Sequence, residues 1–405
     1  MAERDSEKYL TSMEKMAEDY RAGRSSVNYP EVIIDDGDAK SFFGAICSGI
    51  KKSTGINENF ETEEIGQLAL DIKKIISVNA KRDWRDNIIV HRNIKKELDD
   101  KSIEYKMTNK GALVATIPGI NNEYQKTLSC HVDTLGAMVK EVKCNGRLAL
   151  TQIGGFMMSS IEGECCEIHT RDGKVFEGTI QTIKPSVHIH SDARELPRTV
   201  DNYEVVIDRE VFSKEDTNKL GIEVGDFVSF DPRVKINEVG FIKSRHLDDK
   251  ASVAAILYVI NHMNVTEMKP SNTINFFFSN YEEVGHGSSA GIPDNTKELI
   301  AVDMGCPGTG QNSTEYDVCI CTKDSGGPYD FELTSRLINI AKTNNIGYKT
   351  DIYPNYGSDA GAMLRAGYDV KTALIGPGIY ASHGYERTNM KSIISTVDLI
   401  LEYVK

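Results

Sequence analysis

A change in sequence texture between residues 142 and 239 constrains the fold of this chain more than any other feature. Helical periodicity disappears in this stretch, and short runs rich in β-forming residues alternate with pairs of turn residues. Many short strands separated by such turns are typical of a small β-barrel or β-sandwich. The turn pairs are Asn145-Gly146, Gly154-Gly155, Asp172-Gly173 and Gly225-Asp226, and the strands are expected at 147–153, 167–170, 175–183, 205–207 and 226–230.

The sequence on both sides of this stretch has the pattern of an α/β domain. After Phe241 strand-like and helix-like segments alternate, which indicates a parallel or mixed sheet with helices on both faces. The expected helices there are 250–263, 329–344, 358–367 and 390–404, and the expected strands are 273–279, 299–303, 349–353 and 372–375. Before the β-rich stretch we expect a helix around residues 88–98 and strands at 103–107, 112–117 and 127–132.

The simplest architecture is one α/β domain, residues 61–141 and 240–405, interrupted by an inserted β domain at 142–239. Residues 1–60 form an N-terminal extension that is expected to be helical in part, because apolar residues recur at helical spacing within 6–21. A chain of 405 residues is long enough for two or three domains of ordinary size.

The charge balance argues against nucleic acid or an anionic membrane as a partner. The chain has 47 basic and 60 acidic side chains, a net charge of −13, whereas a phosphate backbone requires a basic face. The N-terminus is too charged for a signal peptide, and no apolar run is long enough to span a bilayer. The eight cysteines form no Cys-x-x-Cys pair, so we expect reduced thiols in a cytoplasmic protein, with Cys130 a buried strand residue.

Five side chains in the α/β part of the sequence are candidate metal ligands: His131, Asp248, Glu283, Asp303 and His383. Two imidazoles and three carboxylates suit a pair of adjacent divalent cations that share a water or hydroxide. His131, Glu283 and Asp303 lie at or just beyond the ends of expected strands, where α/β sheets place their ligand sites. Glu282, beside the third candidate, can act as a general base because a neighbour of a ligand is within reach of that water.

Each motif also has an ordinary structural interpretation when it is taken alone. Asp248 or Asp249 can be a helix N-cap, the Glu282–Glu283 pair can be an acidic turn, and Asp303 can begin a turn. The glycine-rich loop around His383 is ambiguous by itself, and His-x-Asp is a weak motif. Asp133 shares a strand face with His131, so its carboxylate can orient the imidazole.

The order of the motifs is what identifies them. The series His-x-Asp, Asp-Asp, Glu-Glu, Asp, His resembles the dinuclear-metal glutamyl-aminopeptidase family, which includes the tetrahedral aminopeptidases and zinc peptidases labelled endoglucanases. Further matches extend over most of residues 105–400. They include Gly136-Ala137-Met138-Val139, Gly146-Arg147-Leu148, Ile153-Gly154-Gly155, the segment 220–226, and Ser358-Asp359-Ala360.

The resemblance implies a zinc-peptidase-like α/β/α catalytic domain interrupted by a small β-barrel that mediates dimerisation. It also implies roles for the candidate residues. His131 and Asp303 would bind one metal, and Glu283 and His383 the other. Asp248 would bridge the two metals, and the peptide bond between Asp248 and Asp249 would be cis. Glu282 would serve as base and then acid, and Asp133 would orient His131.

The sequence departs from the family pattern at Thr134, where an acid is usual, at Lys250, where Arg is usual, and through its first hundred residues. The expected function is nevertheless a metal-dependent aminopeptidase, with two zinc or cobalt ions per chain, that removes N-terminal residues from peptides as a homo-oligomer, either a dimer or a dodecamer. Two alternatives stay open: a related amidohydrolase or dipeptidase acting on small acylated amino acids, and a non-catalytic assembly scaffold with the same fold. A glycoside hydrolase is not supported, because it ordinarily uses a carboxylate pair without metals.

Overall fold

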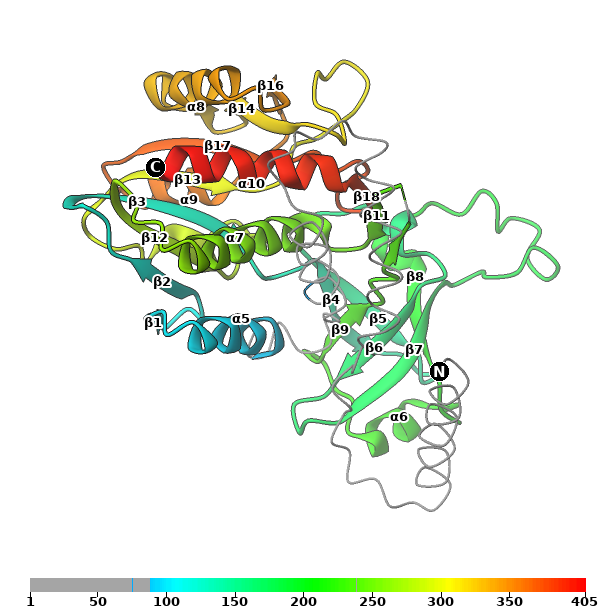
Figure 1. Ribbon diagram of the computed structural model, residues 1–405. Helices are drawn as coiled ribbons and strands as arrows, with labels where there is room; N and C mark the ends of the chain where they lie inside the picture. The colour runs from blue at the N-terminus through cyan, green and yellow to red at the C-terminus, as the bar shows by residue number, and fades with distance from the viewer. Residues whose placement is uncertain (1–74, 76–87, 238) are drawn as a thin grey trace, which may run out of the picture. The chain divides into compact units, whose positions relative to one another are not determined.

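The computed structural model describes residue 75 and residues 88–237 and 239–405 (Figure 1). The helix expected within 6–21 and the rest of the N-terminal extension lie outside the described residues. The first described element, α5 (Ile88–Asp100), is the helix expected around 88–98.

A mixed sheet forms the centre of the α/β domain, as predicted. β3 (Asn121–His131), β12 (Asn272–Ser279), β13 (Thr296–Val302) and β17 (Lys371–Pro377) are its parallel strands, in the order β12-β3-β13-β17. Antiparallel β2 (Leu113–Ile117) and β14 (Val318–Asp324) flank them, and the remaining strands are β1 (Tyr105–Met107), β15 (Gly327–Pro328) and β16 (Tyr348–Ile352). The continuous apolar run at the end of β12 is fully buried, which is what a central strand covered on both faces requires.

Helices cover both faces of this sheet. Lys126 of β3 donates a hydrogen bond to the backbone of Tyr403 in α10 (Met390–Val404), whereas Ser129 donates to Asp359 in α9 (Asp359–Arg365). Residues three apart on a strand face opposite sides, so α9 and α10 lie on opposite faces. α10 packs beside α7 (Leu247–Val265) and α8 (Phe331–Thr343), and these helices confirm the four expected after Phe241 (Figure 1).

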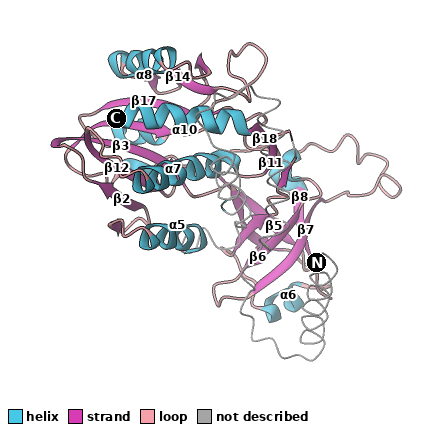
Figure 2. Ribbon diagram, viewed as in Figure 1, coloured by secondary structure: helices cyan, strands magenta, loops and turns pink. Residues whose placement is uncertain are grey.

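The β-rich stretch forms a closed antiparallel barrel with the strand order β4-β5-β8-β7-β6-β9. Figure 2 labels four of these strands, β5 to β8. The strands are β4 (Gly136–Val142), β5 (Leu148–Ile153), β6 (Cys165–His169), β7 (Val175–Thr182), β8 (Tyr203–Ile207) and β9 (Phe227–Phe230). Their inward side chains, among them Leu148, Ile168, Ile180 and Tyr203, form a separate apolar core. The strand pattern alone left barrel and sandwich open, but the family resemblance implied a barrel. The pairing of β4 with both β5 and β9 closes the barrel and confirms that expectation.

Two details of the insert differ from the sequence-based expectation. The first barrel strand, β4, begins at Gly136, before the expected start of the insert at residue 142. It pairs with β9 to close the barrel, and such a pairing is not visible in local sequence. A short helix, α6 (Lys214–Leu220), interrupts the strands. It is capped by the side chain of Ser213, which accepts a hydrogen bond from the Asp216 N–H, and at seven residues it is too short to show periodicity.

A small three-stranded sheet, which the sequence analysis did not predict, lies at the return from the barrel. It consists of β10 (Lys235–Ile236), β11 (Phe241–Ser244) and β18 (Glu386–Asn389). The register pairs Ser244 with Glu386. The segment after β11 leads to Asp248, and the loop that contains His383 ends at the neighbouring strand β18. The short 3-10 helices are η1 (Met158–Ile161), η2 (Val200–Asn202) and η3 (Gly287–Ser289).

Within the described part of the chain, no helix combines the length and apolar character needed to cross a bilayer. The seven cysteines in this part are free thiols, and Cys130 is buried in β3, as expected.

Candidate active site

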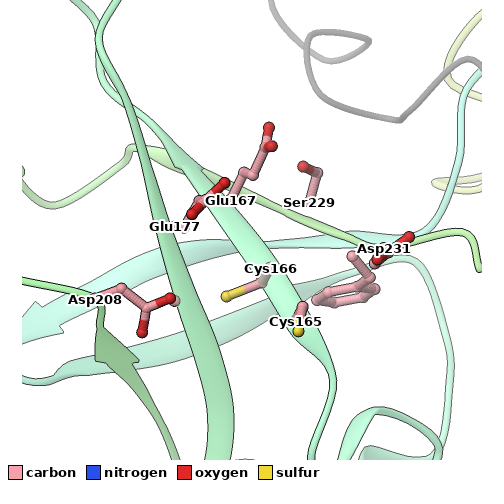
Figure 3. A pocket seen from close by; sticks show the side chains of 9 residues that line it. Cys165, Cys166, Glu167, Glu177, Asp208, Ser229 and Asp231 are labelled. Atoms are coloured by element: carbon pink, nitrogen blue, oxygen red, sulfur yellow. The ribbon is translucent and has the colours of Figure 1, made fainter. Parts of the chain in front are cut away.

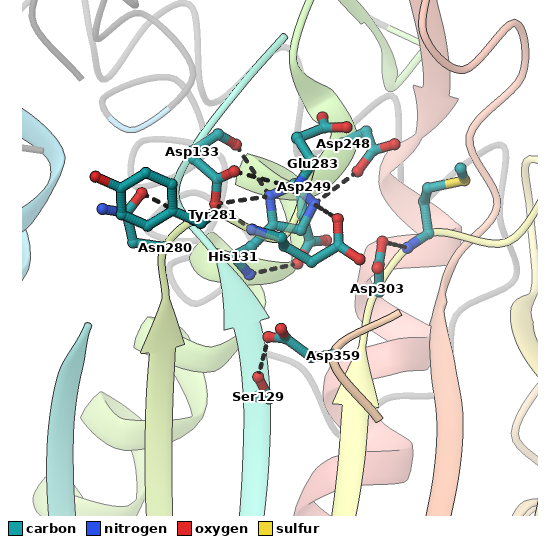
Figure 4. A network of polar contacts seen from close by, with 12 residues as sticks. Ser129, His131, Asp133, Asp248, Asp249, Asn280, Tyr281, Glu283, Asp303 and Asp359 are labelled. Carbon is teal, nitrogen blue, oxygen red and sulfur yellow. Dashed lines mark hydrogen bonds and ion pairs between the residues drawn. The ribbon is translucent and has the colours of Figure 1, made fainter. Parts of the chain in front are cut away.

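The candidate ligands meet at one edge of the sheet, beyond the carboxyl ends of the parallel strands. Figure 4 shows four of them: His131, Asp248, Glu283 and Asp303. His131 is the last residue of β3, Asp303 follows the last residue of β13, and Glu283 lies four residues beyond the end of β12. His383 is in the loop after β17, and Asp248 is at the start of α7. Parallel strands end at a common edge, so residues up to 252 positions apart in the sequence are brought together here.

Asp248 lies between the two histidines. Its Oδ1 is 3.0 Å from Nε2 of His131, and its Oδ2 is 3.3 Å from Nε2 of His383. The same imidazole nitrogen of His383 is 3.6 Å from a carboxylate oxygen of Glu283. Among the described residues, two groups have ligand atoms close enough to hold a metal ion, and both include His131. One contains Asp248 and Glu283, and the other contains Asp249 and Asp303.

The carboxyl groups of this cluster are crowded and buried. Burial, together with the nearby Asp248 carboxylate, raises the pKa of Asp303 to about 7. Burial also raises the pKa values of Glu282 and Glu283 well above their usual range, with neighbouring acids acting in the same direction. Oε1 of Glu283 is buried and has no hydrogen-bond partner among the described residues. Buried carboxylates of this kind need a counter-charge, so the donor set fits divalent cations of the zinc or cobalt type.

Asp133 holds the backbone of the two adjacent glutamates. Its Oδ1 accepts a hydrogen bond from the Glu282 N–H and its Oδ2 one from the Glu283 N–H, each at 3.1 Å. Nδ1 of His131 is 2.9 Å from the backbone oxygen of Asp133 but 3.8 Å from its carboxylate. The structure therefore places the carbonyl of Asp133, rather than the carboxylate considered in the sequence analysis, closest to the imidazole.

The peptide between Asp248 and Asp249 is cis, as the resemblance implied. Oδ2 of Asp249 accepts a hydrogen bond of 3.1 Å from the backbone N–H of His131. The two adjacent aspartates therefore contact the same ligand in different ways, one through its imidazole and the other through its main chain.

Four of the five candidate ligands line a cavity of about 400 Å³, within the usual range for a small-ligand site. Asp248, Glu282, Glu283, Asp303 and His383 form one part of its wall. The other part contains Met304, Cys306, Asn355, Tyr356, Ser358, Arg365 and Ser382.

Comparison with known proteins identifies the family. A sequence model described as M42 glutamyl aminopeptidase matches residues 111–399. The chain belongs to the M42 glutamyl aminopeptidase family. It is an enzyme, an aminopeptidase of peptidase family M42.

Relatives and solved structures agree with this assignment. The putative aminopeptidase YhfE of Bacillus subtilis (strain 168) is 47% identical over 334 residues, which cover 82% of this chain and 96% of that protein. The fold is similar to that of a TET aminopeptidase from the marine sediment archaeon Thaumarchaeota archaeon SCGC AB-539-E09. The TM-score is 0.74 at 17% identity, covering 84% of this chain and 97% of the other. Pyrococcus horikoshii TET1 peptidase gives a TM-score of 0.71 at 21% identity, covering 83% and 99%.

The inserted barrel of this M42 enzyme also contacts the site. Nδ1 of His383 lies within hydrogen-bond distance of the backbone oxygen of Gly155, which follows β5. Gly154 adopts φ +76°, and a Cβ at this position would lie 2.5 Å from the Leu135 side chain. The Ile153-Gly154-Gly155 motif therefore allows the barrel to place a carbonyl against the imidazole of a candidate ligand.

Sequence reasoning did not find the buried polar residues behind the site. Asp359 accepts hydrogen bonds from Ser129 Oγ of β3 and from the Ser288 N–H, which ties α9 to the loop after Glu283. Arg245, also buried, donates to the backbone oxygen of Gly384, next to His383. Asp359 lies in the Ser358-Asp359-Ala360 motif, but a single sequence does not show which polar residue of a motif is buried.

A second pocket lies on the barrel, away from these ligands (Figure 3). It has a volume of about 290 Å³ and is lined by residues of β6, β7 and β9 together with Asp208 and Asp231. Four acids and two cysteines contribute to its wall: Glu167, Glu177, Asp208, Asp231, Cys165 and Cys166. Among the described residues, the groups with metal-binding geometry are both at the sheet edge and not in this pocket.

Proposed function

We propose that this M42 aminopeptidase removes N-terminal residues from peptides by means of two divalent metal ions, zinc or cobalt, bound at the edge of the sheet. Bound there, the two cations would lower the pKa of a shared water and polarise the scissile carbonyl. His131 and Asp303 would hold one ion, and Glu283 and His383 would hold the other. The observation that carries the proposal is the position of Asp248, whose two oxygens face the two imidazoles as a bridging carboxylate would.

Glu282 transfers the proton in this mechanism. One of its carboxylate oxygens is 3.8 Å from Nε2 of His131, and the side chain lines the cavity. The carboxylate takes a proton from the attacking water and returns it to the leaving amine. Asp133 keeps Glu282 in place, because its carboxylate accepts the Glu282 backbone N–H.

The acidic wall of the cavity supports attack at the chain end. A free α-amino group is cationic at neutral pH, so carboxylates beside the metals would bind it and place the first peptide bond over the attacking water. An acylated amino acid lacks this charge. Peptides with free N-termini are therefore the proposed substrates, rather than small acylated amino acids.

The decisive experiment compares Glu282→Gln with Glu123→Gln, a control at an exposed glutamate near the end of β3 opposite to His131. We expect Glu282→Gln to retain two metals per chain by elemental analysis and to lose roughly 10²–10⁴-fold in kcat on residue anilides. The Glu123→Gln control should match the wild-type protein. Wild-type turnover in Glu282→Gln would refute the assigned base, and loss of one metal would make Glu282 a ligand instead.

A substrate panel tests the rest of the proposal. Residue anilides, dipeptides, longer peptides and N-acetylated amino acids are assayed after metal removal and re-addition of zinc, cobalt or manganese. Cleavage of free N-termini with zinc or cobalt supports the proposal. Preferential cleavage of N-acetylated amino acids would instead indicate an amidohydrolase.

We also propose that the chain acts as a homo-oligomer, either a dimer or a dodecamer. The support is the shared fold with Pyrococcus horikoshii TET1 peptidase, which can assemble into a tetrahedron or a large octahedral shell. Light scattering on the purified full-length chain distinguishes a monomer, which would contradict the proposal, from a dimer or a dodecamer.

A further inference from the structure

Glu386 occupies a buried position between two loops that supply candidate metal ligands. It is the first residue of β18 and is only 1% exposed. Its register partner in β11 is Ser244, four residues before Asp248. His383 lies three residues before Glu386 on the other side. The small sheet therefore brings both ligand loops to this carboxylate.

Each oxygen of Glu386 accepts a hydrogen bond from the main chain of a candidate ligand. Oε1 accepts the His383 N–H at 2.9 Å, and Oε2 accepts the Asp248 N–H at 3.2 Å. One side chain thus joins the backbones of two residues that are 135 positions apart. The two oxygens of one side chain accept these hydrogen bonds at the same time, so Glu386 can fix both backbones.

The two loops need such a restraint, because their backbones enter unfavourable conformations near the ligands. His246 has φ 64°, and Ala381 and His383 have φ values of 59° and 61°. A non-glycine residue in the left-handed region is sterically unfavourable and persists only where the surroundings hold it. The Glu386 carboxylate accepts the N–H of His383, which is itself one of these residues. It also accepts the N–H of Asp248, which lies two residues after His246.

Asp133 provides the same arrangement on the other side of the site. Its two oxygens accept the N–H groups of Glu282 and Glu283, as those of Glu386 accept the N–H groups of Asp248 and His383. Two buried carboxylates together hold the main chain of four residues that surround the cavity. A side-chain amide cannot replace either of them, because it offers one acceptor and one donor instead of two acceptors.

We propose that Glu386 is a positioning residue, whose carboxylate sets the separation of Asp248 and His383 and thereby the affinity for the metal held by His383. This inference rests on the proposed two-metal function. It assigns to Glu386 no contact with substrate and no part in proton transfer.

The test compares Glu386→Gln with Glu298→Gln. Glu298 is a matched control because it is an equally buried carboxylate whose oxygens accept hydrogen bonds from Tyr124 and Tyr403, away from the ligands. We expect Glu386→Gln to weaken binding of the second zinc or cobalt ion about 10–100-fold in competition with a chelator. The absorption spectrum of the cobalt-loaded variant should also change. The control should bind both metals as the wild-type chain does, even if it unfolds more readily.

Amide hydrogen exchange in metal-free wild-type protein gives a second test that does not depend on a variant folding. The proposal predicts slow exchange at the N–H groups of Asp248 and His383 before any metal is added. Fast exchange at both, or wild-type metal affinity in Glu386→Gln, would overturn it. Failure of the proposed function has a different signature, since the wild-type chain itself would then not bind two metals.

Discussion

The two sides of the candidate site are built in different ways. His131 and Asp303 extend directly from neighbouring strands of the buried sheet, and their side chains are almost fully enclosed. Glu283 and His383 lie in loops, and the His383 side chain is 35% exposed. The sheet side is positioned by the strand register, whereas the loop side depends on Asp133, Glu386 and the barrel carbonyl of Gly155. Because one side is rigid and the other depends on adjustable contacts, we expect the two proposed metals to bind with different strengths.

The largest effect is expected from removal of both metals. Chelation should reduce aminopeptidase activity to the uncatalysed background, and added zinc or cobalt should restore it. It should also lower the melting temperature, because a ligand at 1,000 times its Kd stabilises the folded state by about 4 kcal/mol. Calorimetry and anilide assays before and after chelation check both effects. Two separate release steps would support the comparison, whereas a single step would show that the two sides bind equally.

Substitutions on the two sides should differ in how the remaining metal is held. Asp303→Ala removes a ligand from the sheet side, and His383→Ala removes one from the loop side. Both should lose roughly 10³-fold or more in kcat/KM, because catalysis needs both ions. His383→Ala should keep one tightly bound ion, since the sheet register still positions His131, and Asp303→Ala should keep a weaker one. Chelator competition with elemental analysis measures this, and the opposite order would reverse the comparison.

Asp133→Asn should impair catalysis without removing metals. The amide can accept only one of the two N–H groups of Glu282 and Glu283, so the base loses its fixed position. We expect kcat to fall about 10–100-fold while the metal content stays at two per chain. Steady-state kinetics with elemental analysis separates this result from metal loss, which would show that Asp133 acts mainly through His131.

A smaller effect is expected where the barrel meets the loop side. Glu164, near the start of β6, forms an ion pair with Arg245. Its Oε1 is 3.0 Å from Nη2 of Arg245, and both side chains are buried. Glu164→Ala leaves that guanidinium without its counter-charge and should destabilise the protein by about 3 kcal/mol. Urea unfolding measures the loss. Zinc affinity on the loop side should weaken as well, because Arg245 also contacts Gly384, and unchanged affinity would argue against this connection.

The smallest effect should come from an ion pair on the barrel surface. Lys140 and Asp201 are 3.3 Å apart and mostly exposed, so Lys140→Ala should change the free energy of unfolding by less than about 1 kcal/mol. It serves as the baseline for Glu164→Ala in the same urea experiment. A larger loss would show that the barrel surface is coupled to the rest of the fold.

Features with a local physical signature could be predicted from the sequence. The apolar run of β12 and the long buried stretch of α7 are visible as periodicity and composition, and so are the turn pairs of the barrel. Candidate ligands at strand ends could also be found, because a charged residue directly after a buried strand stands out. The ordered series of motifs then identified the family that the comparisons show.

The pairing between distant segments could not be predicted from local sequence, and the barrel itself was implied only by the family resemblance. Barrel closure through β4 and β9 joins residues about 90 positions apart, and the sheet of β11 and β18 joins residues about 140 apart. The roles of Asp359 and Glu386 depend on tertiary structure of this kind. A sequence does not distinguish an acidic residue that is buried from one that is exposed.

By itself, the sequence determined which residue types could bind metal, and that they would lie where parallel strands end, because strand and helix preferences act over a few neighbouring residues. Only the tertiary structure decided which partner each of them meets. It placed Asp248 between two imidazoles, the Asp133 carboxylate on the glutamate backbone, and a barrel carbonyl against His383. Those contacts depend on register and barrel closure, and the free energy that selects them comes from burial summed over the whole domain.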